Sequence, residues 1–183
     1  MPPEPTQIDL ANLFRANGSG LAGAVRGVLG SRTEVGEVLQ GAFLKAWTAT
    51  SNGHTPADPT AWIFVLTLNH ARDLRRTQQR RGSAVNLDDV DAMQLASSQQ
   101  RPDAALSQAE TLGAARHAIS RLNDEQREVF LLRSSAELTY EAIAAALSIP
   151  VGTAKTRMRS ALAALRQSLA PHTPEHIADG GLQ

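Results

Sequence analysis

Apolar residues in the segment 34–49 recur at the three- and four-residue spacing of an amphipathic helix. The predicted inward face comprises Val35, Val38, Leu39, Ala42, Phe43, Ala46 and Trp47. The opposite face carries Glu37, Gln40, Gly41, Leu44 and Lys45. Leu44 is apolar among polar neighbours, which hints at a partner surface, although single exposed leucines are common on proteins.

A second long helix is expected over 60–81. The run Trp62–Leu66 alone could form a buried strand, but the length of the pattern and the polar residues that follow favour a helix. At about 100° per residue, Phe64 and Leu68 point away from the face that carries Trp62 and Ile63. Upstream, residues 8–29 also have a helical pattern, weakened by five glycines from Gly18 to Gly30, each costing about 1 kcal/mol relative to alanine.

The second half of the chain has a clearer helical pattern. One helix is set by apolar residues from Leu106 to Leu122, and Asn123 followed by Gln126 is the start of a capping box for the next. Thr139 can cap a third helix, and the turn at 148–150 leads into a last helix over about 151–169. Two helices joined by a short turn, the second of them basic, are typical of a DNA-reading helix-turn-helix.

The last helix divides into an inward apolar stripe and an outward polar face. The inward stripe comprises Ala154, Met158, Ala161, Leu162 and Leu165. The outward face comprises Gly152, Thr153, Lys155, Thr156, Arg159 and Ser160, with Arg157 at its margin. Arginine and lysine can contact guanine edges or phosphates, and threonine and serine can donate to either, so this face suits a major groove.

Composition and charge place these patterns in an all-α protein of two small domains. The 183 residues are 42% apolar and only 4% aromatic, with 20% charged residues, a globular balance rich in helix formers. Residues 82–101 are rich in Ser, Gln and Asp and lack an apolar period, as in a linker. We expect an N-terminal helical domain over 1–81, a flexible linker over 82–101, a four-helix domain with the helix-turn-helix over 102–170, and a tail over 171–183.

The distribution of charge is more informative than its sum, which is zero. Basic residues gather at the end of the 60–81 helix and on the last helix. Either run could simply be a solvated helix face. A neutral protein is not expected to hold nucleic acid tightly by itself.

Several classes of protein are disfavoured. The absence of cysteine excludes disulfides, thiolate metal sites and a cysteine nucleophile. The pair His172 and His176 does not complete a metal site, no phosphate-binding loop is present, and no catalytic constellation or cofactor site is found. The N-terminus does not look like an export signal, and no apolar run is long enough for membrane insertion, which is compatible with a cytoplasmic protein.

With both halves in view, the sequence resembles the extracytoplasmic-function sigma factors of bacterial RNA polymerase. Residues 35–47 look like the family's polymerase-binding helix, and residues 61–76 look like the helix that helps to melt the minus-10 element. Residues 138–157 are similar to the minus-35-reading motif. Gly36 and Gly41 stand where the family usually has acidic residues, and Leu68 stands where it usually has a basic one.

The resemblance implies a division of roles. Contacts to the polymerase clamp are expected from Glu37, Gln40, Leu44 and Lys45. Contacts to the minus-10 element are expected from Asn52, His54, Asn69, Arg72, Arg75 and Arg76, with the loop 51–58 around an extruded base. Contacts to the minus-35 element are expected from Gly152, Thr153, Lys155, Thr156, Arg157, Arg159 and Ser160 on the last helix.

The resemblance thus implies a non-enzymatic, cytoplasmic promoter-specificity subunit that partners core RNA polymerase at its clamp and flap, promoter DNA and an anti-sigma factor. The alternative is a stand-alone helix-turn-helix regulator that binds duplex DNA as a dimer. Such a regulator should bind a palindrome without polymerase and should offer a dimerising helix.

Overall fold

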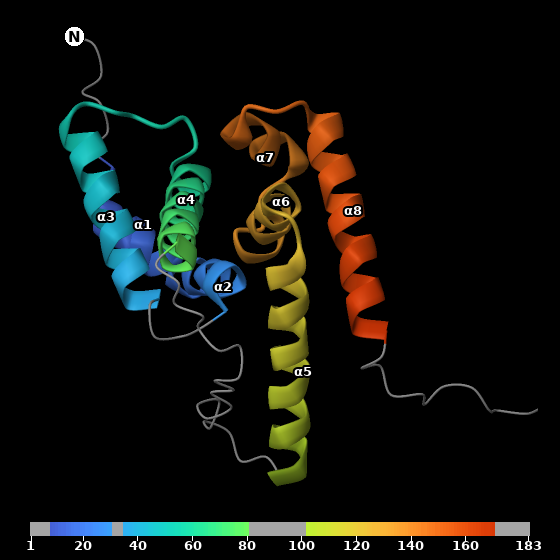
Figure 1. Ribbon diagram of the computed structural model, residues 1–183. Helices are drawn as coiled ribbons and strands as arrows, with labels where there is room; N and C mark the ends of the chain where they lie inside the picture. Colours follow the sequence, from blue (N-terminus) through green and yellow to red (C-terminus); the bar gives the residue numbers. More distant parts are fainter. Residues whose placement is uncertain (1–7, 31–34, 81–101, 171–183) are drawn as a thin grey trace, which may run out of the picture.

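The computed structural model describes residues 8–30, 35–80 and 102–170, which form eight helices and no strand (Figure 1). The predicted all-α fold class is confirmed. The first four are α1 (Leu10–Ala16), α2 (Gly18–Leu29), α3 (Val35–Ser51) and α4 (Pro59–Arg80). The second four are α5 (Pro102–Arg121), α6 (Asp124–Ser135), α7 (Tyr140–Leu147) and α8 (Val151–Leu169). Within these described ranges, none of the helices has the combination of length and apolarity that crossing a membrane requires. The proposed linker and tail, and the pair His172 and His176, lie outside them.

The N-terminal segment is two helices rather than one. Asp9 caps α1 by accepting a hydrogen bond from the backbone N–H of Asn12 at 3.0 Å, and the chain then breaks at Asn17. The second helix, α2, ends at Gly30, whose φ of 76° is the left-handed conformation that glycine adopts readily.

Helix α3 follows the predicted pattern with one exception. Val38, Ala42 and Ala46 are fully buried, but Trp47 is 58% exposed. Each four-residue step advances the side chain by about 40° around a helix, so the stripe that begins in the core at Val35 has turned away from it by Trp47. The indole instead stacks against Phe43, with ring centroids 6.4 Å apart.

The faces of α4 differ from those predicted. Phe64 and Leu68, which were expected to point away from Trp62, are among the most buried side chains in the described part of the molecule. The reason is that α4 is covered on more than one side, by α3 and by α2 together with the second group of helices. Leu68 therefore contributes to the core rather than to a basic surface.

The caps of the C-terminal helices confirm the predictions from local sequence. The side chain of Asn123 accepts a hydrogen bond from the N–H of Gln126 at 2.8 Å, and the hydroxyl of Thr139 accepts one from the N–H of Ala142 at 3.1 Å. Ser148 then takes a left-handed conformation with φ of 54°, and Pro150 begins α8. This turn places α7 and α8 as a helix-turn-helix.

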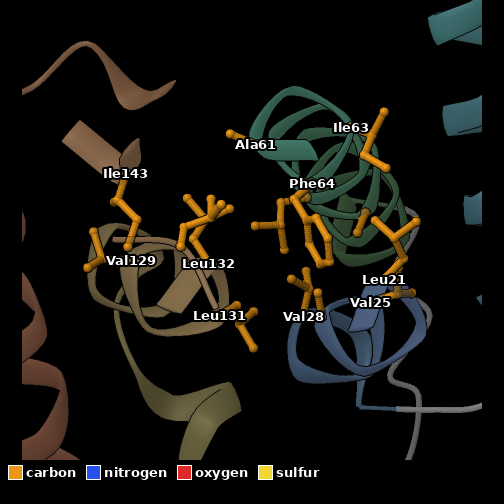
Figure 2. Packing of buried hydrophobic residues seen from close by; sticks show 14 of the residues in the cluster. Leu21, Val25, Val28, Ala61, Ile63, Phe64, Val129, Leu131, Leu132 and Ile143 are labelled. Carbon is orange, nitrogen blue, oxygen red and sulfur yellow. The ribbon is translucent and has the colours of Figure 1, made fainter. Parts of the chain in front are cut away.

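The two groups of helices share one apolar core. Figure 2 shows Val28 and Phe64 facing Leu131 and Leu132 across the contact. Glycine on α2 permits this close approach, because a Cβ atom at Gly20 would lie 2.3 Å from the backbone oxygen of Ser135 on α6. The glycines that weaken α2 in isolation thus allow α6 to pack on it.

Candidate nucleic-acid interface

Helix α8 presents the outward face that the sequence predicted. Ala154, Met158, Ala161 and Leu165 are buried against the other helices. The exposed side is formed by Gly152, Lys155, Thr156, Arg159 and Ser160, with Thr153 partly buried. None of the 19 residues of α8 is acidic, so the face carries positive charge and hydroxyl donors without internal neutralisation.

Arg157 lies at the border of that face and is held by a partner. Its guanidinium forms an ion pair with Glu125 of α6 at 2.8 Å, and the Arg157 side chain is 23% exposed. The prediction that this residue lies at the margin of the outward face is confirmed. The ion pair also ties α8 to α6.

Tyr140 is a residue of this face that sequence reasoning missed. The Arg133 guanidinium lies 5.7 Å and the Lys155 ammonium 5.9 Å from the centre of its ring, distances suited to cation–π attraction. Arg133 also donates a hydrogen bond to the carbonyl of Leu138 at 2.9 Å, which fixes the turn before α7. A hollow of about 370 Å³ lies between Tyr140, Lys155 and Arg159. The sequence signal that could have identified Tyr140 is its position directly after the cap residue Thr139, between the basic residues Arg133 and Lys155.

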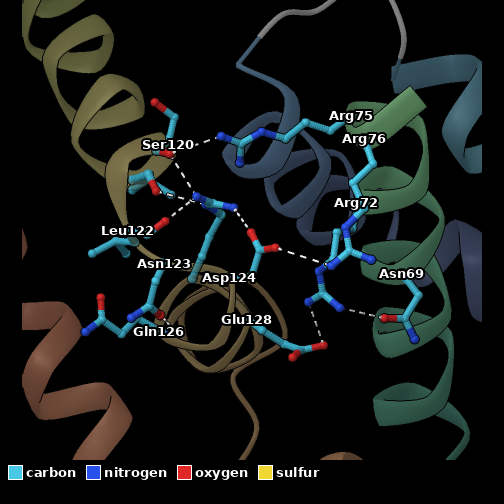
Figure 3. Close-up of polar contacts among 12 residues, drawn as sticks. Asn69, Arg72, Arg75, Arg76, Ser120, Leu122, Asn123, Asp124, Gln126 and Glu128 are labelled. Carbon is cyan, nitrogen blue, oxygen red and sulfur yellow. Dashed lines mark hydrogen bonds and ion pairs between the residues drawn. The ribbon is translucent and has the colours of Figure 1, made fainter. Parts of the chain in front are cut away.

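Three arginines of α4 lie together along one side of the helix: Arg72 and Arg76 are directed at α6, and Arg75 is directed at the end of α5 (Figure 3). Arg72 pairs with Glu128 at 3.0 Å. It also donates a hydrogen bond to Asn69 at 3.1 Å. Arg76 lies 3.7 Å from Asp124. Four of the residues expected at the minus-10 element are thus in contact with, or next to, the second group of helices: Asn69, Arg72, Arg75 and Arg76.

Arg75 and Arg127 complete this polar contact. Arg75 donates a hydrogen bond to the carbonyl of Ser120 at 3.4 Å, while its Nη1 is buried with no hydrogen-bond partner within the described chain. Arg127, which sequence reasoning missed, is 4% exposed and donates to the carbonyls of Ile119, Ser120 and Leu122 at the end of α5. Burial lowers the pKa of Arg127 and the charge of Arg75 lowers it further, whereas Asp124 opposes both.

The loop residues Asn52 and His54 lie apart from this arginine cluster. Both are exposed between α3 and α4, and the His54 ring lies 5.2 Å from that of Trp62. At about 1.5 Å per residue, Arg75 is about 20 Å further along α4 than Trp62. An open hollow of about 570 Å³ adjoins the loop and is lined by Ile8, Asp9 and Leu13 at the start of the chain's first helix and by Thr55 and Pro56 of the loop.

The outer face of α3 is an apolar and charged surface. Glu37, Gln40 and Lys45 are exposed, and Leu44 is 57% exposed. Trp47 adds a second large apolar side chain that was expected in the core. The four residues predicted for this surface, Glu37, Gln40, Leu44 and Lys45, are therefore found on it, and Trp47 joins them although it was expected in the core.

Gly41 on α3 has a packing role. A Cβ atom there would lie 2.2 Å from Nε2 of His70, so the imidazole of α4 fills the space that a side chain would need. Burial lowers the pKa of His70, the charge of Lys45 lowers it further, and Asp73 partly opposes them. The departure from an acidic residue at position 41 thus accompanies a histidine packed against the helix.

No group of three metal-ligating side chains occurs within the ranges that the structure describes. His54, His70 and His117 are separate from one another in the sequence, and the first two have the packing environments given above.

Two families match the chain in consecutive segments. Residues 13–81 match Sigma-70 region 2, and residues 112–165 match Sigma-70, region 4. The first segment contains α2, α3 and α4, and the second contains α6, α7 and most of α8.

Curated relatives are similar over most of their length. The RNA polymerase sigma factor NccH of Alcaligenes xylosoxydans xylosoxydans is 28% identical over 165 residues, which are 88% of this chain and 89% of that protein. CnrH of Cupriavidus metallidurans is 29% identical over 157 residues, covering 84% and 82%. The ECF RNA polymerase sigma-E factor of Escherichia coli K12 is 27% identical over 143 residues, covering 75% of each chain.

Two solved structures are similar in fold. The structure of CnrH in complex with the cytosolic domain of CnrY is 26% identical, with a TM-score of 0.62 over 90% of this chain and 89% of that one. The sigma factor RpoE in complex with the anti-sigma factor NepR from Bartonella quintana gives a TM-score of 0.63 over 88% of this chain and 97% of that one. At 21% identity, the second similarity concerns the fold alone.

Proposed function

We infer the domain roles and binding surfaces of this chain from its family. The chain belongs to the extracytoplasmic-function sigma factors, which have sigma-70 region 2 and region 4 domains. It is a sigma factor, not an enzyme, and it directs RNA polymerase in promoter-specific transcription initiation. A stand-alone helix-turn-helix regulator would account for the second domain only, whereas the match over residues 13–81 requires the first domain as well.

We propose that region 2 occupies residues 1–81 and region 4 residues 102–170, with 82–101 as the linker and 171–183 as a tail. The matched segments 13–81 and 112–165 support these bounds. Helix α4 ends at Arg80 and helix α5 begins at Pro102, which agrees with the proposed limits of the linker.

The observation that best supports promoter reading is the outward face of α8. An exposed helix surface with lysine, arginine, threonine and serine, and with no acidic residue in the helix, is complementary to the major groove of the minus-35 element. We propose Lys155, Thr156 and Arg159 as base or phosphate contacts near its centre. Gly152, Thr153 and Ser160 flank these three residues. Arg157 lies at the margin of the outward face of α8, where it is positioned to anchor a phosphate.

We propose that the minus-10 element is contacted by two separate parts of region 2. Asn52 and His54 lie on the exposed loop beside an open hollow, where an unstacked base could be received. Asn69, Arg72, Arg75 and Arg76 lie further along α4, where guanidinium groups suit phosphates. The spacing of about 20 Å between these parts corresponds to several nucleotides of an extended strand.

Core polymerase is the proposed partner of the outer face of α3. Leu44 and Trp47 supply exposed apolar area, and Glu37, Gln40 and Lys45 supply a polar rim, the usual arrangement of a protein interface. This surface is assigned to the clamp, and region 4 to the flap. We accordingly propose that the protein acts in the cytoplasm, where polymerase and promoters are found.

An anti-sigma factor is a further proposed partner. CnrH has been solved with the cytosolic domain of CnrY, and RpoE has been solved with the anti-sigma factor NepR. The likeness of this chain to CnrH over most of both chains supports a regulator of the same class.

Run-off transcription tests the proposed function. Core RNA polymerase with this chain should start transcripts at defined positions on fragments selected from a promoter library, and core polymerase alone should not. The chain alone should bind promoter duplex weakly, because its net charge is zero. Nanomolar, sequence-specific binding of a palindrome without polymerase, together with inactivity in run-off transcription, would favour the dimeric regulator.

A further inference from the structure

Lysine is rare in this chain, and its two lysines lie on two of its proposed binding surfaces. Of the 18 basic residues, 16 are arginines, and the others are Lys45 and Lys155. Lys45 is exposed on the outer face of α3, and Lys155 is exposed on the outward face of α8. A lysine amine can lose its proton and react as a nucleophile, whereas the guanidinium of arginine stays protonated. Among the side chains, chemistry directed at amines is therefore restricted to these two surfaces.

Lys155 differs from Lys45 because it lines the hollow of about 370 Å³ on α8, whereas Lys45 lines neither of the two hollows described above. Helix α7 packs beside α8 (Figure 1) and supplies Tyr140 to this hollow. The other lining residues all belong to α8 and, at about 100° per residue, lie within about 100° of one another around the helix. Together with Tyr140 they form what we call the α8 hollow: Lys155, Met158, Arg159, Leu162 and Arg166.

The α8 hollow combines anion-binding groups with an apolar wall. Arg159 and Arg166 are exposed, and guanidinium groups bind phosphate through strong, charge-assisted hydrogen bonds. Met158 is buried and Leu162 is partly buried, which gives a hydrocarbon surface that a DNA phosphate does not need. No residue of α8 is acidic, and Lys155 forms no ion pair in the part of the chain that the structure describes. The hollow is therefore suited to a ligand that has both a phosphate and an apolar group, placed beside the Lys155 amine.

The spacing along α8 fits two kinds of carrier. At about 1.5 Å per residue, Arg159 is about 6 Å and Arg166 about 16 Å along the helix axis from Lys155. The first spacing fits a small acyl phosphate, whose phosphate would meet Arg159. The second fits a longer carrier, a coenzyme A thioester, whose phosphates would lie near Arg166 while its pantetheine arm follows the apolar wall. Both ligands are activated acyl groups on a phosphate-bearing carrier.

We propose that Lys155 is an acylation site, at which a phosphate-bearing acyl donor held in the α8 hollow transfers its acyl group to the amine and thereby closes the minus-35 surface. The unprotonated Nζ attacks the carbonyl carbon of the donor and forms an amide bond. The bond from that carbon to the phosphate oxygen, or to the thioester sulfur, breaks with its electron pair on the leaving group. The leaving group takes up the proton that the amine releases, and no oxidant or reductant is needed.

Acylation changes the outward face of α8 in both charge and shape. It removes the positive charge of Lys155 and with it the cation–π attraction to the Tyr140 ring, whose centre lies 5.9 Å from the ammonium. The formal net charge of the chain then changes from zero to a negative value, which disfavours binding to DNA. This consequence rests on the proposed function, because it assumes that α8 binds the minus-35 element.

Site selectivity is the first test, and Lys45 serves as an internal control within the same molecule. The full-length protein is treated with acetyl phosphate, with acetyl coenzyme A, or with the uncharged N-hydroxysuccinimide ester of acetic acid, and peptide mass spectrometry follows the acetylation of both lysines. With at least one phosphate-bearing donor, Lys155 should react about fivefold faster than Lys45, or more, because cation–phosphate pairs concentrate the donor beside it. With the uncharged ester, the two lysines should react at similar rates, since both are exposed.

Removal of the guanidinium groups should abolish this selectivity. Arg159→Gln should lower the rate at Lys155 with acetyl phosphate, and Arg166→Gln should lower it with acetyl coenzyme A, so the two variants identify the carrier. The matched control is Arg121→Gln, which removes an equal charge from an exposed position on α5 outside the hollow. Circular dichroism checks that each variant is folded, and the rate at Lys45 should be unchanged throughout.

Binding to DNA is the second test. The acetylated protein is freed of donor and combined with excess core polymerase, and its binding to a promoter fragment is compared with binding to the same fragment carrying a scrambled minus-35 element. Acetylation should lower the preference for the intact element about fivefold or more and should reduce the salt slope by about one. In Lys155→Arg, whatever its starting affinity, the same treatment should change neither quantity, because the arginine side chain is not acylated.

Three outcomes would overturn the proposal. The first is equal acetylation of Lys45 and Lys155 by both phosphate-bearing donors. The second is a preference for Lys155 that persists with the uncharged ester or in both arginine variants, which would show that the hollow does not hold the donor. The third is a selectively acetylated protein that prefers the intact minus-35 element as before. An unmodified protein with no preference for the minus-35 element would instead refute the proposed function, whereas the selectivity at Lys155 is measured without promoter DNA, so the two failures are distinguishable.

Discussion

Arg159 and Arg157 lie on the same helix, and the structure predicts different roles for them. With about 100° per residue, Arg159 is about 130° from the centre of the buried stripe of α8, and Arg157 is about 70° from it. Arg159 is exposed, whereas Arg157 pairs with Glu125 at 2.8 Å. We therefore expect Arg159 to read a base and Arg157 to anchor a phosphate.

The expected magnitudes follow from these positions. Arg159→Ala should change folding stability by no more than about 0.5 kcal/mol, since surface substitutions rarely exceed that. Its loss of a base contact should cost about 1 to 3 kcal/mol of binding, or roughly 5- to 150-fold, and should relax preference at one position. Arg157→Ala should lose up to about 1 kcal/mol of stability from its partly exposed ion pair. It should also weaken all DNA sequences alike, with a salt slope smaller by about one.

The assay is binding of the holoenzyme to a DNA library varied in the minus-35 element, at several salt concentrations. Glu125→Gln is the matched control, because it releases Arg157 without removing it. If Arg157→Ala alters sequence preference and Arg159→Ala alters only the salt slope, α8 sits in the groove in a different rotation. If neither variant alters either quantity, both arginines are solvated residues of a bundle helix and the reasoning is refuted.

Three further predictions concern region 2. Leu44→Asp should weaken binding to core polymerase but cost about 1 kcal/mol of stability or less, whereas Val38→Asp should unfold the domain by burying a charge; thermal melts and polymerase titrations measure both. Because burial holds the pKa of His70 below its ordinary 6.5, its stabilising neutral form is fully present above about pH 6.5. Stability should therefore fall as the pH drops below that value, and melts from pH 8 to 5 should show a flatter dependence in His70→Gln. Gly41→Ala should destabilise the protein by about 1 to 3 kcal/mol through overpacking, whereas Gly36→Ala, with open space around it, should gain up to about 1 kcal/mol.

Each of these predictions has a result that contradicts it. Equal damage from Leu44→Asp and Val38→Asp would mean that the faces of α3 are wrongly assigned. A His70→Gln variant with the same pH dependence as the original protein would place the acid-sensitive group elsewhere. Equal stability of Gly41→Ala and Gly36→Ala would show that the imidazole does not fill the space beside position 41.

The sequence alone predicted the helices apart from the break between α1 and α2, and it also predicted two of the helix caps and the faces of α8. Helix formation depends on side chains three and four residues apart, and capping depends on hydrogen bonds such as that from Gln126 N–H to Asn123, so the determining residues are close in the chain. The motifs of residues 35–47, 61–76 and 138–157 are also local, and for that reason the family and its function could be identified without coordinates.

Tertiary structure decided which surfaces remain free. Phe64 and Leu68 are buried because α2 and region 4 cover a side of α4 that periodicity alone leaves open. The arginines of α4 meet Asp124 and Glu128, about 50 residues away in the sequence, through contacts that no local pattern encodes. A helical period defines which side chains share a face, but the partner of that face depends on how separate segments pack together. The exposure of Trp47, the buried position of Arg127 and the role of glycine on α2 all follow from that packing.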